Sequence, residues 1–281
     1  MKLKTMEKHL LVVDLSNQLY RASAAYPSLS SSGVFTGGLY GVIEGLQKTI
    51  FETNCTHLIF CEDVKPYIRE KQYPEYKSVR KSAKDEELVE RKIVSEKLVK
   101  DLCKVLKWPI WGIQGFEYDD LLAHIATKYR HRFKTITAMS NDSDLYQLFK
   151  WPSFQISKGK KGIYTHSDYS VEWGLSSRDL CLALAMTGTH NDVAGIPGIG
   201  EVTARKILRD PPRLREVLKD HGQLIERNLS LITLPHPDFP TDIAIPDLRH
   251  PFLERDFMKF CGRYDITVTK KMIEAFERLG K

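Results

Sequence analysis

The sequence predicts an α/β fold with a mainly parallel sheet. Three short apolar runs have the length and composition of buried strands: HLLVVD at 9–14, HLIFCED at 57–63 and TITAMSND at 135–142. Helical patterns lie between these runs and beside them, at 38–51, 86–106 and 119–129. Strands that alternate with helices are typical of a parallel sheet.

The remaining elements divide the chain into two parts. A further short strand, WPIWGI at 108–113, leads into the acidic stretch GFEYDDLLAHIA at 115–126, and FQISKGKKGIYT at 154–165 has the pattern of a β-hairpin. Helical segments then follow with little strand signal. We therefore expect an α/β core over residues 1–174 and a mainly helical region over 175–281.

The composition indicates an ordinary globular protein with a mildly basic charge. The 281 residues carry a formal net charge of +6, which suits a polyanionic partner. The five cysteines are widely spaced and form no C-x-x-C pair, so neither a disulfide framework nor a zinc ribbon is expected. The apolar run after the first basic residues is too short for a signal sequence, and no segment approaches membrane-spanning length. We expect a cytoplasmic protein with no membrane partner.

Carboxylates follow the predicted strands. Since the carboxyl ends of parallel strands open into the same crevice, these side chains are expected to converge there. Each acid taken alone is more commonly a helix cap or a turn residue, and the acidic stretch would also suit the first turn of a helix. The seven carboxylates are Asp14, Asp63, Glu117, Asp119, Asp120, Asp142 and Asp144.

A cluster of this size repels itself unless cations lie among its members. Oxygen ligands without histidine or cysteine partners favour Mg²⁺ or Mn²⁺. Two such ions suit phosphodiester hydrolysis, because they lower the pKa of the attacking water and neutralise the attacking and leaving oxygens. A haloacid-dehalogenase-type phosphatase is the rival class, but it requires D-x-D, and Ser16 stands where the second aspartate belongs.

A basic segment follows Asp63. KPYIREKQYPEYKSVRKSAK at 65–84 carries seven basic residues against two acidic ones, interleaved with three tyrosines. Lysine and arginine can neutralise phosphates while tyrosines stack on unpaired bases. A solvated surface segment is the alternative. The position directly after Asp63 favours a role in nucleic-acid binding.

The glycine-rich stretch NDVAGIPGIGEVTARKIL at 191–208 predicts a tight hairpin between two helices. Its three glycines, Gly195, Gly198 and Gly200, do not have the spacing of a dinucleotide-binding loop. A hairpin of this kind lets backbone N–H groups and a helix N-terminus approach a DNA phosphate. A purely structural turn is the alternative.

These stretches together resemble the structure-specific 5′-nucleases, which include bacteriophage flap endonucleases and the 5′-nuclease domain of bacterial DNA polymerase I. The resemblance covers roughly 10–208 and rests on VVDLSN, Asp63, YPEYKSVR, GFEYDD, SNDSDL and TGTHNDVAGIPGIGEVTA in family order. It implies a PIN-like nuclease core, a helical arch at about 65–105 over the active site, two divalent metals, and a helix-three-turn-helix that grips duplex DNA.

The resemblance also implies roles for individual residues. Lys77 and Arg80 match arch residues that act on the scissile phosphate, and the glycine hairpin resembles a segment that holds a potassium ion. The first metal group would be Asp14, Asp63, Glu117, Asp119 and Asp120, and the second Asp142, Asp144 and Asp192. The residues expected to contact DNA are Arg21, Tyr76, Lys81, Gly195, Gly198 and Gly200.

One stretch departs from the family pattern. The family has G-D-x-x-D-N, whereas this chain has Thr189 in place of the first aspartate and Val193 in place of the asparagine. The second metal site is therefore expected to be less acidic than in relatives.

The expected activity is a metal-dependent 5′-3′ exonuclease or flap endonuclease of replication and repair. It would act as a monomer on DNA with 5′ flaps, nicks or free 5′ ends, and on RNA in RNA–DNA hybrids, in a bacterial cell or a phage-infected host. Two other classes stay open at this point. One is a catalytically weakened or inactive DNA-binding relative, and the other is a PIN-like ribonuclease.

Overall fold

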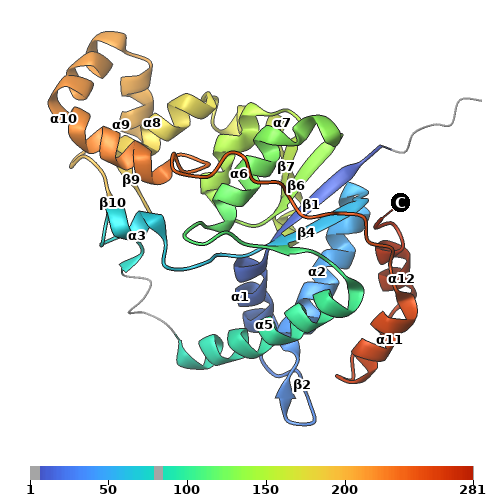
Figure 1. Ribbon diagram of the computed structural model, residues 1–281. Coiled ribbons are helices and arrows are strands. Elements are labelled where there is room, and N and C mark those ends of the chain that lie inside the picture. Colours follow the sequence, from blue (N-terminus) through green and yellow to red (C-terminus); the bar gives the residue numbers. More distant parts are fainter. Residues whose placement is uncertain (1–6, 79–84, 281) are drawn as a thin grey trace, which may run out of the picture.

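The computed structural model describes residues 7–78 and 85–280 of the chain (Figure 1). Its centre is a six-stranded sheet in the order β5-β4-β1-β6-β7-β8, in which only the edge strand β8 runs antiparallel to its neighbour. This arrangement confirms the predicted α/β class. The strands are β1 (His9–Asp14), β4 (His57–Cys61), β5 (Ile110–Trp111), β6 (Thr135–Met139), β7 (Phe154–Ser157) and β8 (Ile163–Thr165).

Helices cover both faces of the sheet because successive residues of β1 point to opposite sides. Leu11 and Val13 belong to one apolar cluster, whereas Leu10 and Val12 belong to another. The first cluster is completed by α1 (Leu15–Ala25), α2 (Gly37–Thr53), α5 (Glu86–Leu106), α11 (Glu254–Gly262) and α12 (Lys270–Phe276). The second is completed by α6 (Tyr118–Lys128), the 3-10 helix η2 (Ser143–Lys150) and α7 (His166–Glu172).

A third apolar cluster lies in the helical part of the chain. It joins α8 (Ser177–Thr187), α9 (Glu201–Leu208) and α10 (Pro211–Ile232), which gather at one end of the molecule in Figure 1. The short strands β9 (Gly188–Thr189) and β10 (Val193–Ala194) pair between α8 and α9. Beyond α10 the chain returns to the sheet, where α11 packs on α5 and α12 packs on α2. The chain after residue 175 thus contributes to both parts of the molecule.

Several elements are too short to produce a recognisable hydrophobic periodicity in the sequence. They are the hairpin of β2 (Ser30–Ser31) and β3 (Val34–Phe35), the helix α3 (Ile68–Gln72), and the 3-10 helices η1 (Arg130–Arg132) and η3 (Gly159–Lys161). The longer elements agree with the predictions, and the expected hairpin at 154–165 is confirmed by the pairing of β7 with β8. Across the described residues, no helix combines the length and apolar character needed to cross a membrane.

Candidate metal centre

The sheet brings acidic residues to one crevice. From β1 the chain proceeds to β4 and β5 on one side, whereas β6, β7 and β8 lie on the other side. The crevice beyond the carboxyl ends of β1 and β6 is therefore the switch point at which ligands bind in such sheets. Asp14 is the last residue of β1, Asp63 follows β4, and Asp142 follows β6.

Hydrogen bonds fix the first of these carboxylates. Asp14 caps α1 by accepting from the N–H of Asn17 at 2.9 Å, and its other oxygen accepts from Ser140 Oγ at 3.2 Å. The carboxylate of Asp63 accepts from the N–H of Tyr118 at 2.8 Å. Backbone and hydroxyl donors therefore aim both carboxylates before any ligand arrives.

The crevice accumulates negative charge. Burial and, after it, the charges of Asp63 and Asp142 raise the pKa of Asp14 to about 7, against the two hydrogen bonds, which lower it. Burial also holds the pKa of Asp119 well above its usual range, with Asp142 and Asp14 adding to the effect and Lys77 opposing it. Since ionising these groups together is unfavourable, the crevice is suited to cations.

The two adjacent aspartates of the acidic stretch have different environments. Asp119 faces the charges of Asp14 and Asp142, as its raised pKa shows. Asp120 is completely buried, and its oxygens accept from Arg69 at 2.6 and 2.7 Å and from the N–H of His236 at 2.8 Å. The structure therefore places Asp120 in an ion pair instead of at the crevice, which corrects its predicted position among the converging acids.

Arg69 connects three segments through one buried guanidinium. Besides Asp120, it donates to Glu117 at 3.1 Å and to the carbonyl oxygen of Leu231 at 2.7 Å. Glu117 is the N-cap residue of α6, and Asp120 accepts from its N–H at 3.2 Å. The helix-start interpretation of the acidic stretch is thus confirmed for these two residues.

The basic segment reaches the acids through Glu117. The ammonium of Lys77 forms an ion pair with this carboxylate, and the Tyr76 hydroxyl donates to it at 2.9 Å. Burial lowers the pKa of Lys77, but the charge and hydrogen bond of Glu117 and the charges of Asp119 and Asp63 together outweigh burial, so the net pKa is raised and the ammonium stays charged. Lys77 also donates its backbone N–H to the carbonyl oxygen of Asn191 at 3.0 Å.

Tyr76 does not offer its ring to solvent in this structure. Only 4% of the residue is exposed, because its ring belongs to the third apolar cluster. The expected stacking partner for an unpaired base is therefore not presented by this conformation. Two other predicted residues, Arg80 and Lys81, lie outside the described residues.

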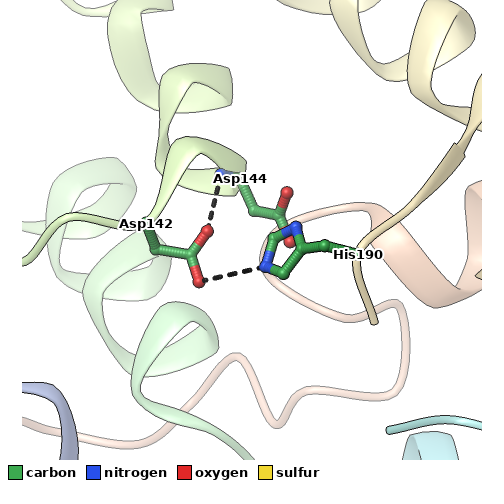
Figure 2. A group of neighbouring side chains, drawn as sticks. All are labelled: Asp142, Asp144 and His190. Atoms are coloured by element: carbon green, nitrogen blue, oxygen red, sulfur yellow. Dashed lines mark hydrogen bonds and ion pairs between the residues drawn. The ribbon is translucent and has the colours of Figure 1, made fainter. Parts of the chain in front are cut away.

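A second group of ligand atoms follows β6. The side chains of Asp142, Asp144 and His190 place one ligand atom each within 4.8 Å of the others (Figure 2). Asp142 accepts from the N–H of Asp144 at 2.9 Å, and His190 Nε2 lies 3.9 Å from Asp142 Oδ2. Asn191 Nδ2 donates to Asp144 Oδ2 at 3.1 Å.

His190 and Asn191 were not predicted from the sequence pattern. The pattern predicted the neighbouring Asp192, which is not a member of the ligand group found among the described residues and which has φ +62°. Thr189 lies in β9 and accepts from the N–H of Asn191 at 3.2 Å. One sequence signal could have indicated these ligands: the imidazole of His190 and the amide of Asn191 stand directly before Asp192, and both groups are potential metal ligands.

Members of both groups line one small pocket. Glu117 and Asp119 come from the start of α6, whereas Asp144 follows β6 and Asn191 lies between β9 and β10. The acids of the α/β core and the loop of the helical part therefore meet at one place. The remaining lining residues are Arg69, Tyr76, Thr189, Leu231, Ile232 and Leu234.

The three hairpin glycines have unequal roles. A Cβ on Gly195 would lie 2.2 Å from the carbonyl carbon of Thr187, so only glycine permits this close approach. Gly198 has φ +81°, and no atom of the described residues lies within 4 Å of a Cβ built on Gly198 or Gly200. The backbone at Gly198 and Gly200 is therefore open to a ligand, whereas Gly195 is needed for packing.

Arg21 lies beside the connection between β7 and β8. Its guanidinium Nη2 is 2.6 Å from the Cβ position of Gly159, in the connection between β7 and β8, and partial burial lowers the pKa of Arg21. The structure thus places this predicted DNA contact beside the β7–β8 loop.

Carboxylates gathered at the switch point of an α/β sheet define a candidate site for divalent cations. The family model for the 5′-3′ exonuclease, N-terminal resolvase-like domain, matches residues 9–174, which is more than half of the chain. The chain belongs to the 5′-3′ exonuclease family.

Curated relatives agree with this assignment. DNA polymerase I of Bacillus caldotenax is 27% identical over 278 residues, which cover 89% of this chain and 30% of the relative. The 5′-3′ exonuclease of Aquifex aeolicus is 29% identical over 216 residues, which cover 76% of this chain and 73% of that protein. The chain thus spans less than a third of the length of this polymerase relative.

A solved structure shows the same fold. The bacteriophage T5 flap endonuclease, in a complex with DNA and metal ions, superposes with a TM-score of 0.68 at 21% identity. The match covers 96% of this chain and 100% of that one. At this identity the likeness shows the shared fold, and it agrees with the predicted nuclease core.

Proposed function

We propose that the protein is a metal-dependent 5′-3′ exonuclease and flap endonuclease that hydrolyses DNA phosphodiesters at or near 5′ ends, nicks and flaps during replication and repair. The observation that carries this proposal is the meeting of Asp14, Asp119 and Asp142 at the switch point of the sheet, in a member of this family. Their mutual charge repulsion supports cation binding at the point where a phosphodiester would lie.

The donor set fits divalent ions. Asp14, Asp63, Glu117 and Asp119 would hold one ion, and Asp142 and Asp144 would belong to the second site, with Mg²⁺ or Mn²⁺ as the occupants. Carboxylate oxygens are the ligands that both ions prefer. Bound there, the ions would supply water activation and neutralisation of the phosphodiester charge.

Among the residues that the structure describes, Lys77 is the one best placed to act on the scissile phosphate. Its charged ammonium is held at the acidic pocket by Glu117, and its backbone is tied to Asn191. A cation fixed before the reaction stabilises charge that develops on phosphate oxygens. Arg80 is proposed for the same role on the resemblance alone, and the arch at about 65–105 would bring both residues to the DNA.

The glycine hairpin and its neighbours are proposed to grip duplex DNA as a helix-three-turn-helix. The open backbone at Gly198 and Gly200 supports phosphate contact or a potassium ion held by carbonyl oxygens. Arg21, Tyr76 and Lys81 are the further proposed DNA contacts. RNA–DNA hybrids as substrates, a monomeric state, and the division into a core at 1–174 and a DNA-binding region at 175–281 are part of the same proposal.

A substrate panel tests the function. Matched 5′-flap, nicked, single-stranded DNA and RNA substrates are incubated with Mg²⁺ or Mn²⁺ under single-turnover conditions. We expect cleavage of the flap and the nicked duplex. Asp119→Asn should abolish this cleavage. The control Glu277→Gln, which changes an exposed acid in the distant α11–α12 layer, should preserve it. Binding of DNA without any cleavage would identify an inactive relative, and cleavage of RNA alone would identify a ribonuclease.

A further inference from the structure

The loop between β9 and β10 brings the imidazole of His190 and the amide of Asn191 beside the carboxylates of Asp142 and Asp144. His190 Nε2 lies 3.9 Å from Asp142 Oδ2, and Asp144 completes a group whose ligand atoms lie within 4.8 Å of one another (Figure 2). Two ligand atoms that are each about 2.0–2.2 Å from one ion stand roughly 3–4 Å apart. The His190 side chain is 43% exposed, so its ring has room for the small rotation needed.

Asn191 supplies an independent observation that points to a ligand. The residue is 5% exposed, and its Nδ2 donates to Asp144 Oδ2 at 3.1 Å. Its Oδ1 is buried and has no hydrogen-bond partner among the described residues. A buried amide oxygen without a partner is unfavourable, and this one belongs to a side chain that lines the acidic pocket. A cation in the pocket would satisfy it.

The backbone holds this loop in place. Val193 pairs with Thr189 across β9 and β10, and Thr189 Oγ1 accepts from the N–H of Asn191. The carbonyl oxygen of Asn191 accepts from Lys77. These bonds hold the backbone of Asn191 at both its N–H and its carbonyl oxygen, and so fix the direction of its side chain. The contact of Asn191 with Asp144 is therefore part of the folded loop.

We propose that Asp142, Asp144, His190 and the Asn191 amide oxygen form a mixed nitrogen and oxygen site that takes a first-row transition ion, such as Mn²⁺, Co²⁺ or Zn²⁺, in preference to Mg²⁺. Imidazole suits these ions, whereas Mg²⁺ favours oxygen ligands and keeps several waters. The inference rests on the proposed function, in which this group is the second of two sites. The first site, built from carboxylates, has no such preference.

Metal binding tests the inference without any substrate. The protein is titrated with Mn²⁺, and the free ion is followed by electron paramagnetic resonance. A second titration uses Co²⁺, whose visible d–d absorption is recorded. The affinity for Mg²⁺ is measured by competition against Mn²⁺. His190→Ala is compared with His131→Ala, which removes another exposed histidine. We expect His190→Ala to weaken one Mn²⁺ and one Co²⁺ site about tenfold or more, with Mg²⁺ affinity changed less than about twofold.

A second variant addresses the amide. Asn191→Asp adds a charge to the same position, so we expect Mg²⁺ affinity to rise at least about threefold and the preference for Mn²⁺ to shrink. Unchanged Mn²⁺ and Co²⁺ binding in His190→Ala, in protein that melts like the wild type, would overturn the inference.

The nuclease assay separates the two proposals. If transition-ion binding depends on His190 but no DNA is cleaved, the mixed site is supported and the proposed function fails. If DNA is cleaved while His190→Ala binds every metal as the wild type does, the function stands and the mixed site is refuted.

Discussion

The two ligand groups of the pocket are built in different ways. Asp14 and Asp63 are fixed by the sheet and by donors from adjacent helices, and Asp14 is buried. Asp142 and His190 have 22% and 43% of their side chains exposed. Asp14 and Asp63 therefore depend on the core alone, whereas the second group needs a loop contributed by the helical part.

The largest effect expected in this comparison concerns Asp119 and Asp120. Asp119→Asn removes one of several repelling charges, so we expect the metal-free protein to melt at a higher temperature while cleavage falls more than about a hundredfold. Asp120→Asn weakens the buried pair with Arg69 and should lower the free energy of unfolding by about 3 kcal/mol. Thermal melting and single-turnover cleavage of both variants provide the measurement. Equal effects of the two substitutions would show that the residues do not differ as described.

Lys77 should give the next largest effect. Because its charge lies against the first group, Lys77→Ala is expected to slow single-turnover cleavage by about 10²–10³-fold while DNA affinity changes little. Lys71→Ala, at an exposed position of α3, is the matched control. Equal losses of affinity and rate in Lys77→Ala would identify an ordinary phosphate anchor.

The pH dependence of the metal-free protein should sharpen the difference between the groups. The pKa of Asp14 rises from 3.8 to about 7 on folding, so the native state binds more protons than the unfolded state between these values. The stability of the metal-free protein should therefore decrease as pH rises from about 4 to 7. Saturating Mg²⁺ should flatten this decrease above pH 6, and EDTA should restore it, as measured by melting temperature. Asp14→Asn should reduce the slope, and an unchanged slope would contradict the assignment.

The smallest effect is expected at Asp192. Since Asn191 contacts Asp144 and Asp192 does not belong to the ligand group, Asp192→Asn should change Mn²⁺ affinity less than about threefold, in contrast to His190→Ala. The same Mn²⁺ titration provides the measurement. A tenfold loss in Asp192→Asn would restore the assignment made from the family pattern.

The sequence predicted the parts of the site that the sheet determines. Apolar runs ending in Asp14 and near Asp142 predict both the strands and the edge at which their carboxylates meet, since parallel strands share one carboxyl end. Asp119 and Asp120 could not be told apart in the same way. Successive residues on a helix point about 100° apart, so only one of them faces the crevice, and the period does not say which.

The loop after α8 could not be predicted for a different reason. Its direction depends on the pairing of Thr189 with Val193 and on a positive φ at Asp192, which turn the Asn191 side chain toward Asp144. Asn191 and Asp192 are adjacent, so the spacing of residues in the sequence does not tell which of the two side chains enters the pocket. The roles of the individual residues as metal ligands and DNA contacts stay predictions.

The guanidinium of Arg69 has a consequence for how the molecule responds to force. It joins α3 at the base of the basic segment, the first turn of α6 and the last turn of α10 by hydrogen bonds to Asp120, Glu117 and Leu231. In the proposed function, a duplex held near α10 would load these hydrogen bonds, and the load would reach Glu117 at the acidic pocket through the Arg69 side chain. The proposed DNA contact and the acidic pocket would therefore be mechanically coupled.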